Sequence, residues 1–269
     1  MYNLPTLEAA LASTIYAGKL HFSPVTQSTN TDALEAARSG APHGSVYFAD
    51  EQLAGRGRGD HAWLSAAGQG LYVSILLRPS FPAARLPLMP LAAGLAARDA
   101  IRVSAEIDID IRWPNDLLIG ARKVGGILVE AKTESENVAY AVVGIGVNVH
   151  QREFAGDLAT PATSLDLETS SPVSRQTLLI ELLKSLERET LGLQPPAAIE
   201  TLLGRVQQAS TWVQGRRVVV HGPQACTGIT EGLDEYGFLL VRTATGLVTV
   251  QTGGLRALDD EPAPQADHN

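Results

Sequence analysis

The sequence has very little cysteine: Cys226 is the single one among 269 residues. An intrachain disulfide is therefore excluded, and we do not expect a metal site built on cysteine. The six histidines are scattered along the chain without the spacing of metal ligands. The near absence of cysteine fits a reducing compartment, and we expect a cytoplasmic protein.

Long apolar runs and positive charge are also scarce. No segment approaches the roughly 20 consecutive apolar residues of a membrane span, and the first residues do not resemble a signal peptide. Lysine and arginine number 21 against 29 acidic residues, so the formal net charge is -8. Without a long apolar run we do not expect a membrane as partner. Nucleic-acid-binding proteins are usually basic, so we do not expect nucleic acid as partner either. A local basic patch around an anionic ligand remains compatible with this balance.

The common nucleotide-binding motifs are missing too. The chain has no G-K-[ST] loop, and its two glycine-rich stretches, which begin at Gly55 and Gly144, lack the G-x-G-x-x-G spacing with a following helix. It also lacks the G-x-S-x-G nucleophile elbow. If the protein uses ATP, it binds ATP through neither a Rossmann nor a Walker loop.

The chain does contain an unusual stretch from Gln52 to Trp63, QLAGRGRGDHAW. Glycine lets the backbone approach a ligand closely, and the arginine guanidinium suits carboxylate and phosphate oxygens. Taken alone, such a stretch is more typical of a mobile surface loop. Together with the motifs below, it predicts a loop that folds over an anion.

One predicted strand, residues 138–149, has two different faces in its second half. β-Branched residues occupy one face by the period of two, and Gly144, Gly146 and Asn148 occupy the other. Glycines inside a strand mark close approach of a ligand or of another backbone, and close helix packing explains them about as well. We expect an exposed, smooth floor that ends in one amide, which suits an adenine edge.

Two further motifs carry polar groups. Lys123 opens an apolar strand and is followed by a glycine pair, and for Lys123 and Gly126 to share a face we expect a bulge or a twist. Asn115 and Asp116 follow a strand end, where they either form a turn or bind phosphate-bound Mg²⁺. A surface lysine at a strand end is the alternative for Lys123.

The order of elements indicates two units. We expect helices over residues 4–18, 83–103, 172–191 and 196–208, and another that any of Ser28, Thr29 or Asn30 caps. From residue 218 on, short runs separated by glycines predict a small β-barrel or sandwich. We therefore divide the chain into residues 1–214, residues 215–258 and a polar tail, residues 259–269.

In order and spacing, these motifs together resemble the biotin protein ligase family, the biotin–[acetyl-CoA-carboxylase] ligases. The resemblance covers residues from about 20 to 165, and the C-terminal part more loosely. It is carried by the following motifs: Ser28-Thr29-Asn30, residues 52–59 with Trp63, residues 112–116 (RWPND), residues 123–130 (KVGGILVE) and residues 144–149 (GIGVNV).

The resemblance implies an α+β fold whose mixed sheet and helices are similar to class II aminoacyl-tRNA synthetases, followed by an SH3-like barrel. It implies that biotin and ATP, with Mg²⁺, form biotinyl-5′-AMP and pyrophosphate. Biotin then passes to a lysine of a biotin carboxyl carrier protein or domain. A homodimer is compatible with the resemblance.

The resemblance also assigns roles to residues. The catalytic group is Lys123, Arg56 and Arg58. The biotin-binding group is Ser28, Thr29, Gln52, Gly55, Trp63, Gly126 and Gly144. The ATP-binding group is Asn148, which the resemblance matches to the adenine contact, with Asn115 and Asp116, which we add from their place in the turn; Asp116 is the expected Mg²⁺ ligand.

Three alternatives remain at this point. A lipoyl ligase or transferase shares the fold and the lysine. A biotin-responsive DNA-binding regulator is disfavoured, because the Ser-Thr-Asn motif lies within the first thirty residues and leaves no room for the family's N-terminal helix-turn-helix domain. A nonenzymatic biotin or nucleotide binder is the third alternative.

Overall fold

The computed structural model describes residues 2–59, 61–156, 158–193 and 196–258, and it contains two β-sheets. The larger sheet has seven strands in the order β1-β2-β3-β7-β6-β5-β4, with β1 and β2 parallel and the other neighbours antiparallel. Its strands are β1 (Leu20–Thr26), β2 (Ser45–Gln52), β3 (Gly70–Leu77), β4 (Asp110–Arg112), β5 (Asp116–Ile119), β6 (Arg122–Glu134) and β7 (Asn137–Asn148).

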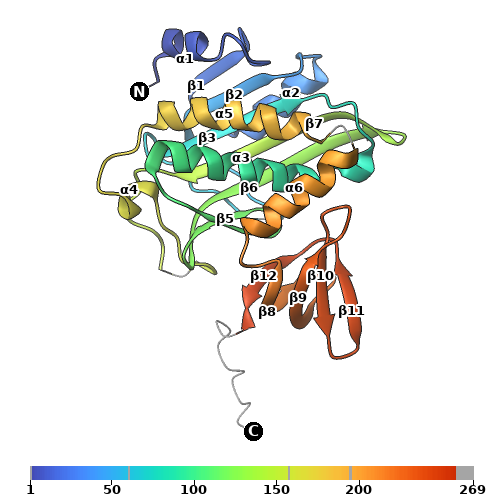
Figure 1. Ribbon diagram of the computed structural model, residues 1–269. Helices are drawn as coiled ribbons and strands as arrows, with labels where there is room; N and C mark the ends of the chain where they lie inside the picture. The colour runs from blue at the N-terminus through green and yellow to red at the C-terminus, as the bar shows by residue number, and fades with distance from the viewer. Residues whose placement is uncertain (1, 60, 157, 194–195, 259–269) are drawn as a thin grey trace.

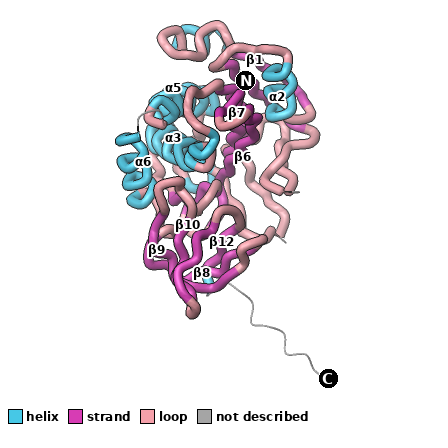
Figure 2. Tube along the Cα trace, turned by 90° about the vertical axis from the view of Figure 1, so that its right-hand side faces the viewer, coloured by secondary structure: helices cyan, strands magenta, loops and turns pink. Residues whose placement is uncertain are grey.

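Helices cover both faces of this sheet. In Figure 2, α3, α5 and α6 lie on one side of it and α2 lies on the other. The helices are α1 (Leu4–Ala10), α2 (Thr29–Arg38), α3 (Leu88–Ala105), α4 (Leu165–Glu168), α5 (Arg175–Leu191) and α6 (Pro196–Gln208), with a 3₁₀ turn over Ala83–Arg85. The core lies between the sheet and the pair α3 and α5, because α3 turns its apolar face toward β6 and β7 and α5 turns its apolar face toward β3.

The smaller sheet is antiparallel and has five strands in the order β11-β10-β9-β8-β12. Figure 1 shows it beside the end of the large sheet where β5 and α6 lie. It is formed by β8 (Gln214–His221), β9 (Cys226–Leu233), β10 (Leu239–Thr243), β11 (Gly246–Val250) and β12 (Gly254–Ala257).

The predicted α+β class, a mixed sheet with helices followed by a small SH3-like β-unit, is confirmed. We retain the division between residues 214 and 215 as a proposal, supported by the start of β8 at Gln214. The predicted tail, residues 259–269, lies outside the described residues.

Two predicted helices differ from the observed ones. The helix expected over residues 4–18 ends at Ala10, and the Thr14 hydroxyl donates to the carbonyl of Leu11, a side-chain bond that competes with helical continuation. The helix expected from residue 83 begins at Leu88, after the 3₁₀ turn and Pro87. None of the helices in the described part of the chain combines the length and apolarity that a membrane crossing requires.

Candidate active site

Most predicted site residues lie on the sheet face that α2 covers, since Asn30 of α2 packs against Gly144 of β7. Figure 2 shows α2 on this side of the sheet. They come from the start of α2, the end of β2 with the loop that follows it, and strands β5, β6 and β7. The register of β6 and β7 places Gly126 directly opposite Gly146, so the glycines of the two strands form one continuous surface.

A chain of buried polar side chains lies at one end of this surface. Gln52 Oε1 accepts hydrogen bonds from Thr29 N at 2.9 Å and Thr29 Oγ1 at 3.1 Å, and Gln52 Nε2 donates to Ser65 Oγ at 2.7 Å. The Thr29 and Ser74 hydroxyls lie 2.7 Å apart, and Ser74 Oγ donates to Asn30 Oδ1 at 2.5 Å. Because these groups hold one another, their donors and acceptors are kept in fixed orientations.

Ser28 belongs to this polar end. It occupies the N-cap position of α2, but its side chain makes no capping hydrogen bond. Ser28 is nevertheless buried, at 2 % exposure. Capping therefore does not use the Ser28 hydroxyl, and the hydroxyl remains available to a ligand.

The glycine face of β7 is covered rather than open. A Cβ on Gly144 would lie 2.1 Å from Asn30 Oδ1, and a Cβ on Gly146 would lie 2.6 Å from the Trp63 indole. The prediction of an exposed floor is therefore wrong in this respect, because Asn30 and Trp63 pack directly onto it. The buried Nε1 of Trp63 has no hydrogen-bond partner among the described residues.

The glycine/arginine loop is a hairpin extension of β2. Bridges pair Gln52 with Ser65 and Arg56 with Ala62, and Trp63 N donates to Gly55 O at 2.8 Å. A Cβ on Gly55 would lie 2.4 Å from Trp63 O, so only glycine allows the two chains to approach this closely. The loop thereby places the Trp63 indole against the surface formed by Gly126, Gly144 and Gly146, here called the glycine floor.

The two loop arginines have different partners. Arg56 Nη2 forms an ion pair with Glu130 Oε2 at 2.6 Å, on the side of β6 that faces the polar end. Arg58 donates to Asn115 Oδ1 at 3.3 Å, and it also reaches the small sheet, where it donates to Gly253 O at 2.9 Å and to Thr252 Oγ1 at 2.8 Å. Burial lowers the pKa of Arg58, and the Asp116 carboxylate opposes this shift.

The β5–β6 register explains how Lys123 reaches the site. Leu118 pairs with Lys123 and Leu117 with Gly125, so Val124 is the extra residue of a bulge. The predicted bulge is thus confirmed. As a result Lys123 Nζ lies 3.5 Å from the position that a Cβ would take on Gly126, and 5.6 Å from the Trp63 ring centroid.

Asp116 holds this lysine in place. Lys123 Nζ lies 2.5 Å from Asp116 Oδ1, while Arg112 donates to Asp116 Oδ2 from Nη2 at 2.7 Å and from Nε at 3.1 Å. Burial raises the pKa of Asp116, but the charges and hydrogen bonds of Lys123 and Arg112 outweigh it, so the pKa lies below its usual value. The carboxylate is therefore ionised at neutral pH.

Comparison with known proteins agrees with this arrangement. Residues 22–148 match the model of the biotin/lipoate A/B protein ligase family, and residues 214–253 match the biotin protein ligase C-terminal domain. The biotin–[acetyl-CoA-carboxylase] ligase of Paracoccus denitrificans is 32% identical over 231 residues, which cover 82% of this chain and 93% of that protein. The enzyme of the same name from Mycobacterium tuberculosis is 33% identical over 235 residues, 85% of each chain.

The chain belongs to the biotin protein ligase family.

A solved structure supports the same assignment. The biotin protein ligase from Aquifex aeolicus in complex with biotin and ATP superimposes with a TM-score of 0.76 at 29% identity, covering 89% of this chain and 98% of that one. The fold of this family member is therefore that of the biotin protein ligases over both sheets.

The amides predicted to bind ATP are partly engaged by the protein itself. Asn115 Nδ2 donates to Ile127 O at 3.0 Å, and Asn148 Nδ2 donates to Thr163 O at 3.0 Å. Asn148 is buried at the end of β7. The ATP-binding roles of Asn115, Asp116 and Asn148 stay predictions, and a contact between Asn148 and adenine has to form through the amide oxygen or exchange the bond to Thr163.

A metal site made by the protein alone is not found. No group of three histidine, cysteine, aspartate or glutamate side chains in the described residues is arranged to hold a metal ion. Both oxygens of Asp116 face cations, Lys123 and Arg112. This donor set suits a Mg²⁺ that arrives on phosphate oxygens and keeps most of its waters.

Several residues of the site were not assigned a site role from the sequence. Glu130 lies inside the KVGGILVE motif, yet its partner Arg56 is 74 positions away. Ser65 and Ser74 belong to none of the motifs, and Thr252 lies in the C-terminal part that resembles the family only loosely. The one local signal was the position of Glu130 on the same strand as Lys123.

Proposed function

We propose that this family member is an ATP-dependent biotin protein ligase. The proposal is carried by one observation: Lys123 Nζ lies over a glycine floor beside the Trp63 indole, at the opposite end from a preorganised polar cluster. A ligand with a polar ring, an apolar tail and a carboxylate fits the polar cluster, the Trp63 indole with its glycines, and the Lys123 ammonium, in that order. Biotin has all three parts.

The polar end suits the biotin ureido ring. Thr29, Gln52 and Ser28 supply donors and acceptors for the ring, and we place the apolar tail along the Trp63 indole, which packs on Gly146. Trp63 Nε1, which has no partner within the described part of the chain, offers a donor for a ligand acceptor atom. We infer that the biotin carboxylate then lies near Lys123.

The chemistry needs fixed positive charge more than a nucleophilic side chain. A carboxylate oxygen of biotin attacks the α-phosphorus of ATP, the bond to the β-phosphate oxygen breaks, and pyrophosphate leaves. Lys123 stabilises the charge that builds on the α-phosphate, and Arg56 and Arg58 bind the anionic groups from the loop. Mg²⁺ would enter with ATP near Asp116 and neutralise phosphate charge.

In the second step the amine of an acceptor lysine attacks the biotinyl carbonyl carbon, AMP leaves, and the amine loses a proton. The mixed anhydride must be shielded from water until then. The loop is placed to do this, because it carries Trp63 over the floor and is tied to β6 by Arg56 and Glu130. We propose a biotin carboxyl carrier protein or domain, such as that of acetyl-CoA carboxylase, as the acceptor.

The deciding experiment is exchange of labelled pyrophosphate into ATP with Mg²⁺, measured separately with biotin, lipoate and octanoate. Exchange with biotin alone is the expected result. Exchange with lipoate alone would keep the mechanism and overturn the substrate, an outcome to test because the matched family includes lipoate ligases. Binding of biotin without exchange would contradict an enzymatic role.

A further inference from the structure

A tryptophan outside the predicted site is linked to Lys123 through three side-chain contacts. Trp212 lies in the segment between α6 and β8, and it is buried at 4 % exposure. The Arg112 guanidinium carbon lies 5.2 Å from its ring centroid, and the Arg216 guanidinium carbon lies 4.0 Å from it. The indole is thus held between one arginine of the large sheet and one of the small sheet.

The backbone around Trp212 is attached to the edge of the large sheet. Ile111 N donates to Ala209 O at 3.1 Å, and Ser210 Oγ donates to Ile111 O at 2.6 Å. Thr211 N donates to Asp110 Oδ1 at 2.9 Å. The segment therefore lies along β4 and places Trp212 beside the residue that ends that strand, Arg112.

Arg112 in turn orients the carboxylate of Asp116. Its side chain is 8 % exposed, and both of its contacts with Asp116 go to Oδ2, which leaves Oδ1 for Lys123 Nζ. A third donor contact, from Arg112 Nη2 to Thr160 Oγ1 at 2.8 Å, fixes the guanidinium plane further. A shift of Arg112 would rotate Asp116 and move the ammonium of Lys123.

We propose that Trp212 is a positioning residue that sets the location of the Lys123 ammonium through Arg112 and Asp116, and that Arg216 of the small sheet holds Trp212 in that place. Its effect on catalysis rests on the proposed function. The small sheet then contributes to adenylation without touching the reacting atoms. Because biotin binds at the polar end, loss of this positioning lowers turnover and leaves biotin affinity intact.

The first readout does not depend on activity. The chain has four lysines, Lys19, Lys123, Lys132 and Lys184. Reductive methylation with ¹³C-formaldehyde labels them with retention of charge, and the variant Lys123→Arg assigns the Lys123 signal. We expect Trp212→Ala and Arg216→Ala to shift the Lys123 signal and to leave the other three in place.

The second readout is biotin-dependent pyrophosphate exchange. We expect Trp212→Ala to lower kcat about 10- to 100-fold with the KM for biotin changed less than about threefold. Trp212→Phe keeps an aromatic face and should recover most of the loss, which a role in folding alone would not require. Arg217→Ala, an exposed neighbour of Arg216 on β8, is the matched control and should match the parent protein.

The outcomes separate the two hypotheses. An unmoved Lys123 signal in both Trp212→Ala and Arg216→Ala would overturn the positioning role, whatever the activity. A shifted Lys123 signal in a protein that shows no exchange with biotin would retain the positioning and refute the proposed function. If Trp212→Ala does not fold, Arg216→Ala and Trp212→Phe decide the question by the same signal.

Discussion

At the scale of single residues, the site depends on the absence of side chains as much as on their presence. Gly144 and Gly146 leave room for Asn30 and Trp63, and Gly55 allows the loop to double back on itself. Lys123 lies on the same surface, because the bulge at Val124 turns its side chain onto the face of Gly126.

Gly146→Ala should displace the Trp63 indole, since the added Cβ would lie 2.6 Å from it, well inside van der Waals contact. We expect a loss of unfolding free energy of about 1–3 kcal/mol and weaker biotin binding, measured by urea unfolding and calorimetry. Gly204→Ala in α6 is the control, because nothing lies within 4 Å of its added Cβ. Equal biotin binding by both variants would show that Trp63 does not form the ligand wall.

Lys123→Ala should lower kcat for biotin-dependent pyrophosphate exchange by about 10²- to 10³-fold, the usual cost of removing one group that stabilises transition-state charge. Biotin affinity should change little, because the polar end is untouched. Lys132→Ala is matched to it, since Lys132 lies on the same strand and is 56% exposed. Similar losses in both variants would remove Lys123 from the reaction.

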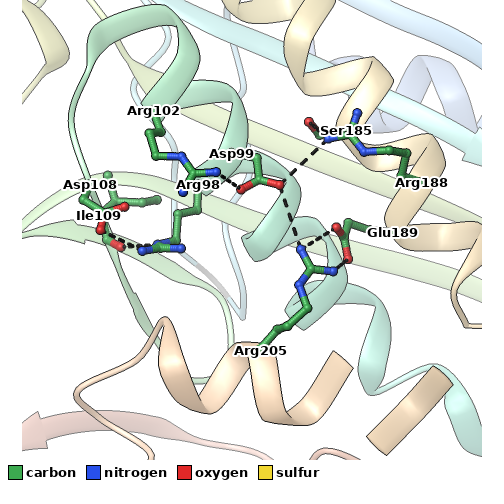
Figure 3. A network of polar contacts seen from close by, with 9 residues as sticks. All are labelled: Arg98, Asp99, Arg102, Asp108, Ile109, Ser185, Arg188, Glu189 and Arg205. Atoms are coloured by element: carbon green, nitrogen blue, oxygen red, sulfur yellow. Dashed lines mark hydrogen bonds and ion pairs between the residues drawn. The ribbon is translucent and has the colours of Figure 1, made fainter. Parts of the chain in front are cut away.

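At the scale of elements, charged side chains tie three helices together on the face opposite the site (Figure 3). Asp99 of α3 pairs with Arg102 at 3.2 Å and lies 3.9 Å from both Arg188 of α5 and Arg205 of α6. Arg205 also makes two 2.8 Å hydrogen bonds to Glu189, whose side chain is only 5% exposed. The network thus fixes α6, the helix that precedes the Trp212 segment.

Arg205→Ala should destabilise the protein by about 3 kcal/mol, because it leaves the buried Glu189 carboxylate without its partner. The control is Arg242→Ala, which breaks an equally well-formed pair with Glu231 on the solvent-exposed surface. We expect that variant to unfold at nearly the parental urea concentration, since exposed ion pairs contribute little. Equal destabilisation in the two variants would contradict the role of burial.

Many of the helices and strands could be predicted from the sequence. The apolar run of β3, the two-faced β7 and the helices that became α5 and α6 follow from local periodicity. The early end of α1 could be predicted only in part, because the local bond from Thr14 to Leu11 is joined by a long-range bond from Ile15 N to Glu187 of α5. Likewise the start of α3 depends on Ala83 N bonding to Glu136 O, across 53 residues of chain.

At the scale of the whole molecule, the two sheets are connected at the turn between β4 and β5. Trp113 Nε1 donates to Gly237 O at 3.0 Å, Arg112 contacts Trp212, and Asn115 is linked through Arg58 to Gly253. Asp116 lies directly after these residues. The ionisation of Asp116 therefore affects both the position of Lys123 in the site and the free energy of unfolding.

Asp116→Asn should reduce the unfolding free energy by about 3 kcal/mol near neutral pH, because Arg112 and Lys123 lose a buried partner. The folded-state pKa of Asp116 is lower than its ordinary value of 3.8, so its stabilisation is present above that pH and is lost as the pH falls through the folded-state pKa. Urea unfolding at a series of pH values should show the gap between variant and parent shrinking in acid below about pH 4. A gap that stays constant down to the most acidic pH would contradict the pairing.

The sequence by itself determined the features that depend on neighbouring residues. These are the glycine-lined face of β7, the bulge that turns Lys123 inward, the glycine/arginine loop and the order of motifs that marks the family. The tertiary structure decided which charges meet: Arg56 with Glu130, Arg58 with the small sheet, and Trp212 between Arg112 and Arg216. Such pairs join segments up to 195 residues apart. The packing of the sheets and helices decides which residues form these pairs, so the pairs cannot be predicted from local sequence patterns.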